Sequence, residues 1–197
     1  MENKTPFMTE IPEQEPQRQQ YFMAHAKEQL HILEENLGRP LTCCINTFGC
    51  QMNARDSEKL LGILETIGYQ AVETEDADFV LYNTCTVREN ANLRVYGRLG
   101  QLGARKKKHP HMMIALCGCM MQEKEVVEKI KKTYRFVDLI FGTHNIFKLA
   151  ELVSICLEER LEELEAQGRE DKKPKHKMVV DVWKDTDQIV EDLVCIF

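Results

Sequence analysis

Three of the eight cysteines in this 197-residue chain stand where thiols could do chemistry, namely Cys50, Cys85 and Cys119. Each lies just after a short apolar run or closes one, and each precedes a segment with helical periodicity. Cys50 and Cys85 are 35 positions apart and Cys85 and Cys119 are 34 apart, about one strand–helix repeat each. In an open parallel sheet, strand-to-helix turns gather at the carboxyl ends of the strands. We therefore expect the three thiols to meet at one edge of a sheet.

Sites made only of thiolates suit iron–sulfur clusters or zinc. Structural zinc usually has four ligands, commonly supplied as C-x-x-C pairs, and this sequence contains no such pair. Three thiols with one metal position left open fit a working iron–sulfur cluster better. A second interpretation is a redox-active pair made of Cys117 and Cys119, although a C-x-C pair is a weak signal by itself.

The remaining cysteines fit a structural role better. A free cysteine often behaves as a small buried hydrophobe. Cys43, Cys44 and Cys117 lie inside predicted strands, and Cys156 lies on the apolar stripe of a predicted helix. We expect these four thiols to be buried in the core, whereas Cys195 allows no interpretation.

Other kinds of site compete with a thiol centre. A nucleotide site is the first rival, but residues 47–50 read Thr-Phe-Gly-Cys, without the G-x-G-x-x-G or P-loop pattern that cradles phosphates. The basic run 105–108 ends a predicted helix, where cations suit the helix dipole, so a solvated helix end is favoured over a phosphate contact. We expect His109 and His111 to be solvated and His144 to support local structure.

The elements that must position the thiols follow from hydrophobic patterning. Strands are expected at 41–46, 70–73, 79–83, 112–116 and 137–141. The helices between them are expected to begin near Asn53, as a capping residue with Asp56 in the first turn, and then at 89–108, at 123–132 and along a long amphipathic segment after residue 143. This alternation predicts an α/β fold, a doubly wound and mainly parallel sheet with flanking helices, over residues 41–166.

Two flanking segments complete the organisation. Residues 1–40 are polar and predict an appended arm outside the core, helical from about 16 to 37, and a solvated extension is the alternative. Residues 167–197 are expected to form a linker and the approach to a further domain. Within them we expect a charged linker at 168–176 and an edge strand at 179–183.

Composition restricts the function classes. The net charge of −6 argues against a chain that grips nucleic acid unaided, because phosphate binding needs a basic face. The cysteines are not spaced as in a small disulfide scaffold, and no signal peptide or apolar run of membrane length appears. We expect no membrane partner and a location in the reducing cytoplasm, where clustered cysteines more often bind metal or do redox work.

The three thiol stretches also carry a resemblance. Residues 49–53 read Gly-Cys-Gln-Met-Asn with Asp-Ser-Glu at 56–58, residues 83–90 read Asn-Thr-Cys-Thr-Val-Arg-Glu-Asn, and Gly118-Cys119 is followed by Gln122. This pattern resembles the N-terminal domain of the methylthiotransferases, which contain a radical S-adenosylmethionine core. It is most similar to the MiaB type, which acts on tRNA, because residues 51–53 and 87–90 separate it from the RimO type.

The resemblance implies that Cys50, Cys85 and Cys119 hold an auxiliary [4Fe-4S] cluster. It further implies methylthiolation of an isopentenylated adenosine in tRNA, with sulfide or methanethiol bound at the open iron. Asn83 and Arg88 are candidates for orienting that sulfur, and Cys117 is not expected to be the fourth ligand.

The chain departs from the family pattern in one respect. The C-x-x-x-C-x-x-C motif that binds a second [4Fe-4S] cluster beside S-adenosylmethionine is absent, and so is the RNA-binding domain. We therefore expect a truncated chain that has no catalytic residue of its own. Alone it is expected to be inactive and to have weak or no affinity for tRNA. The alternative is a stand-alone metal-binding or redox module without methylthiotransferase activity.

Overall fold

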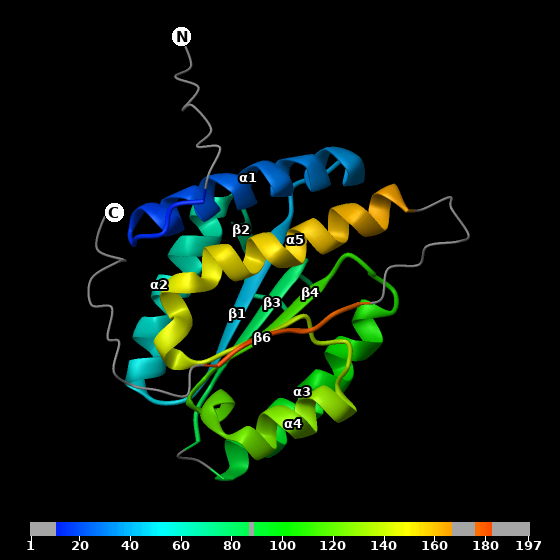
Figure 1. The fold of residues 1–197 in the computed structure, drawn as a ribbon. Helices are drawn as coiled ribbons and strands as arrows, with labels where there is room; N and C mark the ends of the chain where they lie inside the picture. Colours follow the sequence, from blue (N-terminus) through cyan, green and yellow to red (C-terminus); the bar gives the residue numbers. More distant parts are fainter. Residues whose placement is uncertain (1–10, 87–88, 167–175, 183–197) are drawn as a thin grey trace.

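The computed structural model describes residues 11–86, 89–166 and 176–182. Its elements run in the order α1 (Gln17–Leu37), β1 (Thr42–Phe48), α2 (Gln51–Ile67), β2 (Gln70–Ala71), β3 (Phe79–Thr84), α3 (Glu89–Lys106), β4 (Met113–Gly118), η1 (Cys119–Gln122), α4 (Lys124–Thr133), β5 (Leu139–Phe141), η2 (Thr143–Lys148), α5 (Leu149–Glu165) and β6 (Val179–Asp181). The strands form one sheet in the order β2-β1-β3-β4-β5-β6, and all the neighbours pair in parallel. The predicted doubly wound α/β fold is confirmed (Figure 1).

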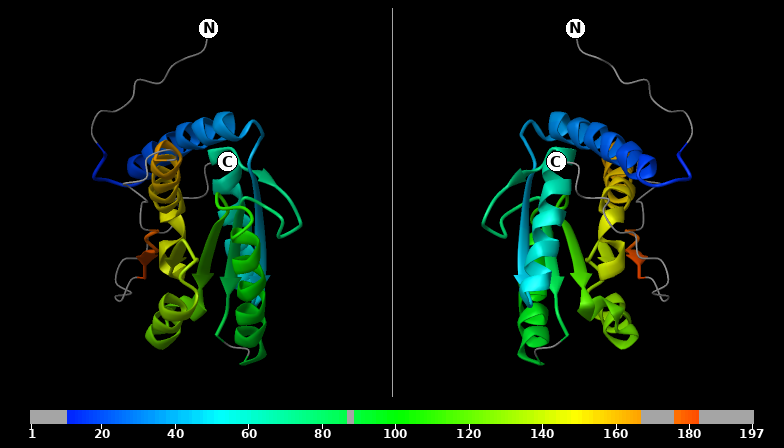
Figure 2. Two further views of the ribbon diagram at one scale, coloured as in Figure 1. Left: turned by 90° about the vertical axis from the view of Figure 1, so that its right-hand side faces the viewer. Right: turned by 90° about the vertical axis from the view of Figure 1, so that its left-hand side faces the viewer.

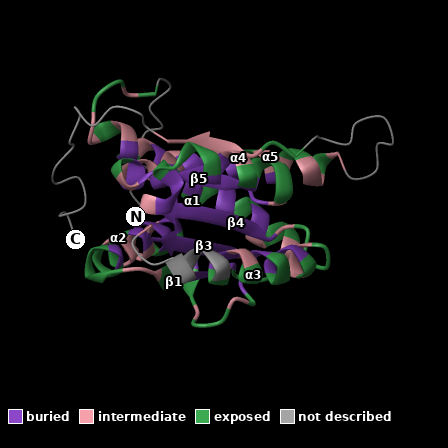
Figure 3. Ribbon diagram, turned by 90° about the horizontal axis from the view of Figure 1, so that it is seen from below, coloured by how far each residue is buried: buried purple, intermediate pink, exposed green. Residues whose placement is uncertain are grey.

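Side chains alternate between two cores because successive residues of a strand face opposite sides of the sheet. In β3, Phe79 and Leu81 join the core under α1, α2 and α5, whereas Val80 and Tyr82 join the core under α3 and α4. Strands β3 and β4 are buried along their whole length, and the exposed residues lie on the outer sides of the helices (Figure 3). Two-sided burial explains why these strands are continuous apolar runs in the sequence.

Helix α1 is part of the main core, so the expectation that residues 1–40 lie outside the core was wrong. It packs against α5 and α2 and buries one side of its surface (Figures 1 and 2). The buried apolar residues on that side are Phe22, Ala26, Leu30 and Leu33. Arg18 holds the start of α1 to α5 through two hydrogen bonds to the Glu151 carboxylate, at 3.1 and 2.5 Å. As predicted, the helix ends at Leu37, and its C-terminal cap is Gly38, whose φ is +70°.

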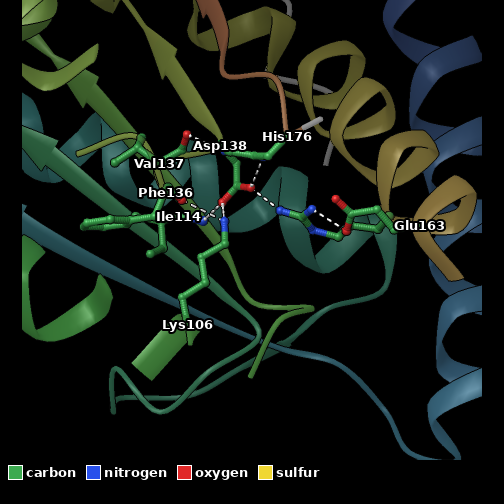
Figure 4. A network of polar contacts seen from close by, with 8 residues as sticks. Lys106, Ile114, Phe136, Val137, Asp138, Glu163 and His176 are labelled. Carbon is green, nitrogen blue, oxygen red and sulfur yellow. Dashed lines mark hydrogen bonds and ion pairs between the residues drawn. The ribbon is translucent and has the colours of Figure 1, made fainter. Parts of the chain in front are cut away.

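A buried network of charged side chains lies at the amino-terminal ends of β4 and β5. The Asp138 carboxylate, directly before β5, accepts hydrogen bonds from the Ile114 N–H at 2.7 Å and from Lys106 and Arg160 (Figure 4). The Lys106 side chain is only 11% exposed. The prediction of a solvated helix end at residues 105–108 was therefore wrong for Lys106, although it holds for the exposed Lys107 and Lys108.

Segment 176–182 returns along the far edge of the sheet. His176 lies 3.6 Å from Asp138, and β6 then pairs with β5 in parallel, so the chain is led back to the carboxyl edge. There the Asp181 carbonyl accepts hydrogen bonds from the Gly142 N–H and from the Asn145 amide. The predicted edge strand is present over Val179–Asp181, while most of the predicted 168–176 linker lies outside the described residues. No helix within the described ranges combines the length and apolar character needed to span a bilayer.

Candidate metal centre

The strand register brings the three predicted thiols to one edge. Phe48, Thr84 and Gly118 are aligned across β1, β3 and β4. Cys85 and Cys119 each follow their aligned residue directly, and Cys50 comes two residues after Phe48. The sheet order reverses at the β1–β3 pair, since β2 lies on the other side of β1, and such switch points are where open α/β sheets bind ligands.

Cys50 is the exposed member of the group. It is the N-terminal cap of α2, in extended conformation, where the first helical N–H groups have no partner within the helix. The Asn53 and Met52 N–H groups lower the pKa of the Cys50 thiol, and the nearby Cys85 thiol lowers it further by hydrogen bonding. The site therefore favours a thiolate at Cys50, as helix N-termini generally do.

Cys85 and Cys119 are less accessible. Cys85 is buried, and Cys119, the first residue of η1, is half-buried. Burial raises the pKa of Cys119, the neighbouring Cys85 and Cys50 thiols raise it further, and the Thr143 hydroxyl lowers it. Because negative charge on one thiol opposes negative charge on the next, three thiolates here would need a cation between them.

Asn53 fixes the end of β3 to the start of α2. Its amide nitrogen donates to Asn83 Oδ1 and to the Thr84 carbonyl, both at 3.0 Å, so its oxygen is turned toward Cys50 and accepts from that thiol at 3.3 Å. The prediction that Asn53 caps α2 was wrong: the helix begins at Gln51, so neither Asn53 nor Asp56 lies in the expected place. The side chain is instead buried because it bridges two elements.

Glycines let the turns approach closely. A Cβ at Gly49 would lie 2.7 Å from Cγ of Asn53. A Cβ at Gly118, whose φ is +99°, would lie 2.1 Å from the Thr84 carbonyl oxygen. Beside this contact the Thr84 hydroxyl donates to the Cys117 carbonyl at 2.6 Å. The ends of β3 and β4 are therefore locked together directly before Cys85 and Cys119.

The other residues singled out in the sequence are buried in the core, have other hydrogen-bond partners or lie outside the described residues. Cys43, Cys44, Cys117 and Cys156 are buried as predicted, and burial raises the pKa of Cys117 well above its ordinary value. The Asn83 amide nitrogen already donates to the Asn53 carbonyl and to Ser57 Oγ. Arg88 and Cys195 lie outside the described residues.

Sequence reasoning missed Thr143. This residue follows Gly142 at the end of β5, the next strand along the same edge, and its hydroxyl lowers the pKa of the Cys119 thiol. Its position just past a buried strand was the same signal that identified the cysteines. Among the described side chains no finished set of three His, Cys, Asp or Glu metal ligands is formed.

Comparison with known proteins identifies the part of the chain that carries the three thiols as a family domain. Residues 42–142 match the model of the uncharacterized protein family UPF0004. The chain is 63% identical over 171 residues to a tRNA-2-methylthio-N(6)-dimethylallyladenosine synthase of Lachnoclostridium phytofermentans, an alignment covering 87% of this chain and 34% of that protein. It is 46% identical over 184 residues to the synthase of the same name from Acetivibrio thermocellus, covering 93% of this chain and 35% of the relative. The chain thus spans about a third of the length of these curated relatives.

Proposed function

This chain belongs to the UPF0004 family and matches the N-terminal part of MiaB-type tRNA methylthiotransferases, and from that premise we propose that Cys50, Cys85 and Cys119 hold an auxiliary [4Fe-4S] cluster. Within a longer protein, this domain would take part in methylthiolation of an isopentenylated adenosine in tRNA. S-adenosylmethionine and a second [4Fe-4S] cluster would be bound by other parts of that protein. The proposal places the protein in the cytoplasm.

One observation carries the proposal: three thiols from three neighbouring parallel strands share the carboxyl edge at the switch point of the sheet. Two of the three are close enough to affect each other by hydrogen bonding. A buried structural cysteine has no reason to lie at a strand end beside two others, whereas a soft metal centre needs this arrangement.

The residues present fit the group. Three thiolates are the ligands of choice for iron–sulfur clusters, and they leave one of the four iron positions of a cubane without a cysteine. The N–H groups at the start of α2 favour the thiolate of Cys50, which metal binding requires. The close-packed turns at Gly49 and Gly118 fix the backbone of the ligands. When bound, the cluster would supply an iron site that can accept an external sulfur ligand.

Other residues of the chain orient and shield the site. Asn53 joins α2 to the end of β3, so Cys50 and Cys85 keep their relative positions. Met120 and Met121 are fully buried directly after Cys119 and keep water from the core side of η1. The outer side stays open because Cys50 and the neighbouring Met52 are exposed, the latter at 69%.

Anaerobic reconstitution is expected to give about four iron and four sulfide ions per chain, as a cubane requires. Replacing Cys50, Cys85 or Cys119 with alanine should abolish or strongly reduce the iron content, measured by metal analysis and by the visible absorption of the cluster. Cys43→Ala and Cys156→Ala are the matched controls, because both thiols are buried in the core and should leave the iron content unchanged.

The competing interpretation, a metal-binding or redox module of another kind, makes a different prediction. Stoichiometric binding of zinc with no uptake of iron under the same conditions would show that the site is not an iron–sulfur centre. Iron loss in the Cys156→Ala control as well would show that the cysteine variants report misfolding.

The sulfur donor and the tRNA are further parts of the proposal. Sulfide or methanethiol is proposed to bind at the iron that no cysteine holds, and tRNA is proposed as the partner of the longer protein. Adding either sulfur compound to the reduced, reconstituted chain should change its electron paramagnetic resonance spectrum, and Cys117→Ala should leave that response intact. A wild-type spectrum indifferent to both compounds, together with a responsive Cys117→Ala variant, would identify Cys117 as the fourth ligand instead.

A further inference from the structure

Basic side chains gather on one side of the sheet. Residues 91–136, which contain most of α3 and all of α4, include 11 lysines and arginines but only 3 acidic residues. The net charge of this segment is therefore +8, within a chain whose total is −6. Helices α3 and α4 cover one side of the sheet, whereas α1, α2 and α5 cover the other (Figure 1). The negative total thus conceals a basic surface.

The basic residues of α3 form a row. Arg94, Arg98 and Arg105 are four and seven positions apart, so they lie on one side of the helix, over about 16 Å of its length. Arg94 is exposed, the Arg98 side chain is 47% exposed, and Arg105 is half-buried. The exposed Lys107 and Lys108 continue the row beyond the end of the helix. The sequence between the first and the last of these residues contains no acidic residue.

The row begins at the edge that carries the thiols. Helix α3 starts shortly after Cys85, and the guanidinium carbon of Arg98 lies 5.5 Å from the ring centroid of Phe48, the last residue of β1. Arg98 also donates one hydrogen bond to Glu75, at 2.9 Å. A guanidinium has five N–H donors, and this bond uses one of them. Arg98 is therefore held beside the strand ends and keeps donors for an external acceptor.

Helix α4 contributes less positive charge than α3. The Lys129 ammonium lies 4.1 Å from the ring centroid of Tyr96 on α3, and this ring stacks on Tyr134 at a centroid distance of 5.9 Å. Lys131 is paired with Glu128. All three acidic residues of segment 91–136 lie within α4 or directly before it. The uncompensated positive charge is therefore concentrated along α3, next to a layer of aromatic rings.

We propose that Arg94, Arg98, Arg105, Lys107 and Lys108, the basic row of α3, contact the phosphate backbone of tRNA and direct it toward the thiol edge. The inference rests on tRNA as the partner proposed above and identifies the surface of this chain that it meets. Lysines and arginines that neutralise phosphates release counterions, which supplies affinity independent of sequence, and such contacts set the position of the nucleic acid. Helix α5, on the other side of the sheet, carries six glutamates and one arginine, so it would repel the same backbone.

The test is the binding of fluorescently labelled, unmodified tRNA to the chain, measured by anisotropy from about 50 to about 200 mM salt. The wild-type chain should bind with a dissociation constant of about 10⁻⁴–10⁻⁶ M and lose affinity as the salt concentration rises. Replacing both Arg94 and Lys107 with glutamine should weaken binding about tenfold or more at the lowest salt. The slope of log K against log salt should fall by about 1.4–1.8, and Lys108→Gln alone should lower it by about half as much.

The matched control replaces both Lys27 and Lys59 with glutamine. These exposed lysines lie on α1 and α2, on the other side of the sheet, and their loss changes the net charge by the same amount. The control should keep the affinity and the salt slope near those of wild type. Equal losses in the two double variants would show that only the net charge matters and would overturn the inference.

Two further outcomes decide between partners. A wild-type chain that does not bind tRNA at about 50 mM salt would also overturn the inference. Poly-glutamate that binds as tightly as tRNA would identify an acidic protein surface as the partner instead. Iron analysis of the same preparations keeps the cluster assignment separate, because none of these variants changes a thiol. A chain that binds tRNA through the row but takes up no iron would refute the cluster and leave the surface assignment standing.

Discussion

Replacing Gly118 with alanine is expected to lower the free energy of unfolding by about 4 kcal/mol or more and to prevent cluster binding. The φ of +99° is a conformation that residues with a side chain rarely adopt. The added Cβ would lie 2.1 Å from the Thr84 carbonyl oxygen and 2.7 Å from the Thr84 nitrogen. These are backbone atoms of a fully buried strand, so they cannot move aside cheaply. The end of β4 would separate from β3 and carry Cys119 away from Cys85.

Gly100→Ala is the control for this substitution. Gly100 lies on the exposed side of α3, and a Cβ added there would meet nothing within 4 Å. Alanine at this position should stabilise the chain by about 0.5–1 kcal/mol, because it has the higher helix propensity. Denaturant unfolding of both variants and iron analysis after reconstitution would measure the difference. Unfolding of Gly118→Ala at the wild-type midpoint would show that the turn is more adaptable than its geometry indicates.

Replacing Asp138 with asparagine is the second change with a large expected effect, a destabilisation of about 3–5 kcal/mol. The carboxylate is 3% exposed and faces two cations, Lys106 and Arg160, whose side chains are 11% and 4% exposed. Asparagine would leave both positive charges without their shared counterion. Glu163 would still accept from Arg160 at 2.8 Å, and Lys106 would keep its hydrogen bond to the Phe136 carbonyl.

The deficit of Asp138→Asn should depend on pH. Burial lowers the pKa of Lys106 in the folded chain, and the charge of Asp138 opposes this effect. A lysine with a lowered folded pKa costs stability at low pH, and the cost disappears as the pH rises through the range between its folded and unfolded values. Without Asp138 the pKa falls further. The difference in unfolding free energy from wild type should therefore shrink as the pH is raised toward the ordinary lysine pKa.

Glu128→Gln is the control for the loss of a charge. Glu128 pairs with Lys131 at 3.0 Å on the exposed side of α4, and such surface pairs contribute little. Its unfolding midpoint should stay near that of wild type. An Asp138→Asn chain as stable as this control at neutral pH would show that the buried network is dispensable. A deficit that grew with rising pH would exclude Lys106 as its source.

The metal centre and the network around Asp138 lie at opposite ends of the same strands. The thiols follow the carboxyl ends of β1, β3 and β4, whereas Asp138 precedes β5. Parallel strands bind ligands at their carboxyl ends, so the charges at the amino end are free to serve stability. The two large effects are consequently separable: Asp138→Asn should weaken the fold without altering the turns that carry the thiols.

Local sequence patterns were enough to predict the order of the elements, the parallel sheet and the sheet edge that carries Cys50, Cys85 and Cys119. This was possible because doubly buried strands are continuous apolar runs and because parallel connections leave little choice about where the turns gather. The same patterns separated the buried thiols of Cys43 and Cys156 from those at strand ends.

Only the tertiary structure, in contrast, shows which polar side chains bond to groups of other helices and strands. Lys106 ends a helix with a basic run, yet it is buried because Asp138 and Arg160 arrive from elsewhere in the chain. Asn53 bridges to Thr84, 31 positions away, and α1 joins the core because α5 covers it. Thr143 lies at the same sheet edge as Cys119 because β4 and β5 are neighbours. Periodicity records which side of an element is apolar, whereas the partner of a polar group depends on distant residues that no local pattern specifies.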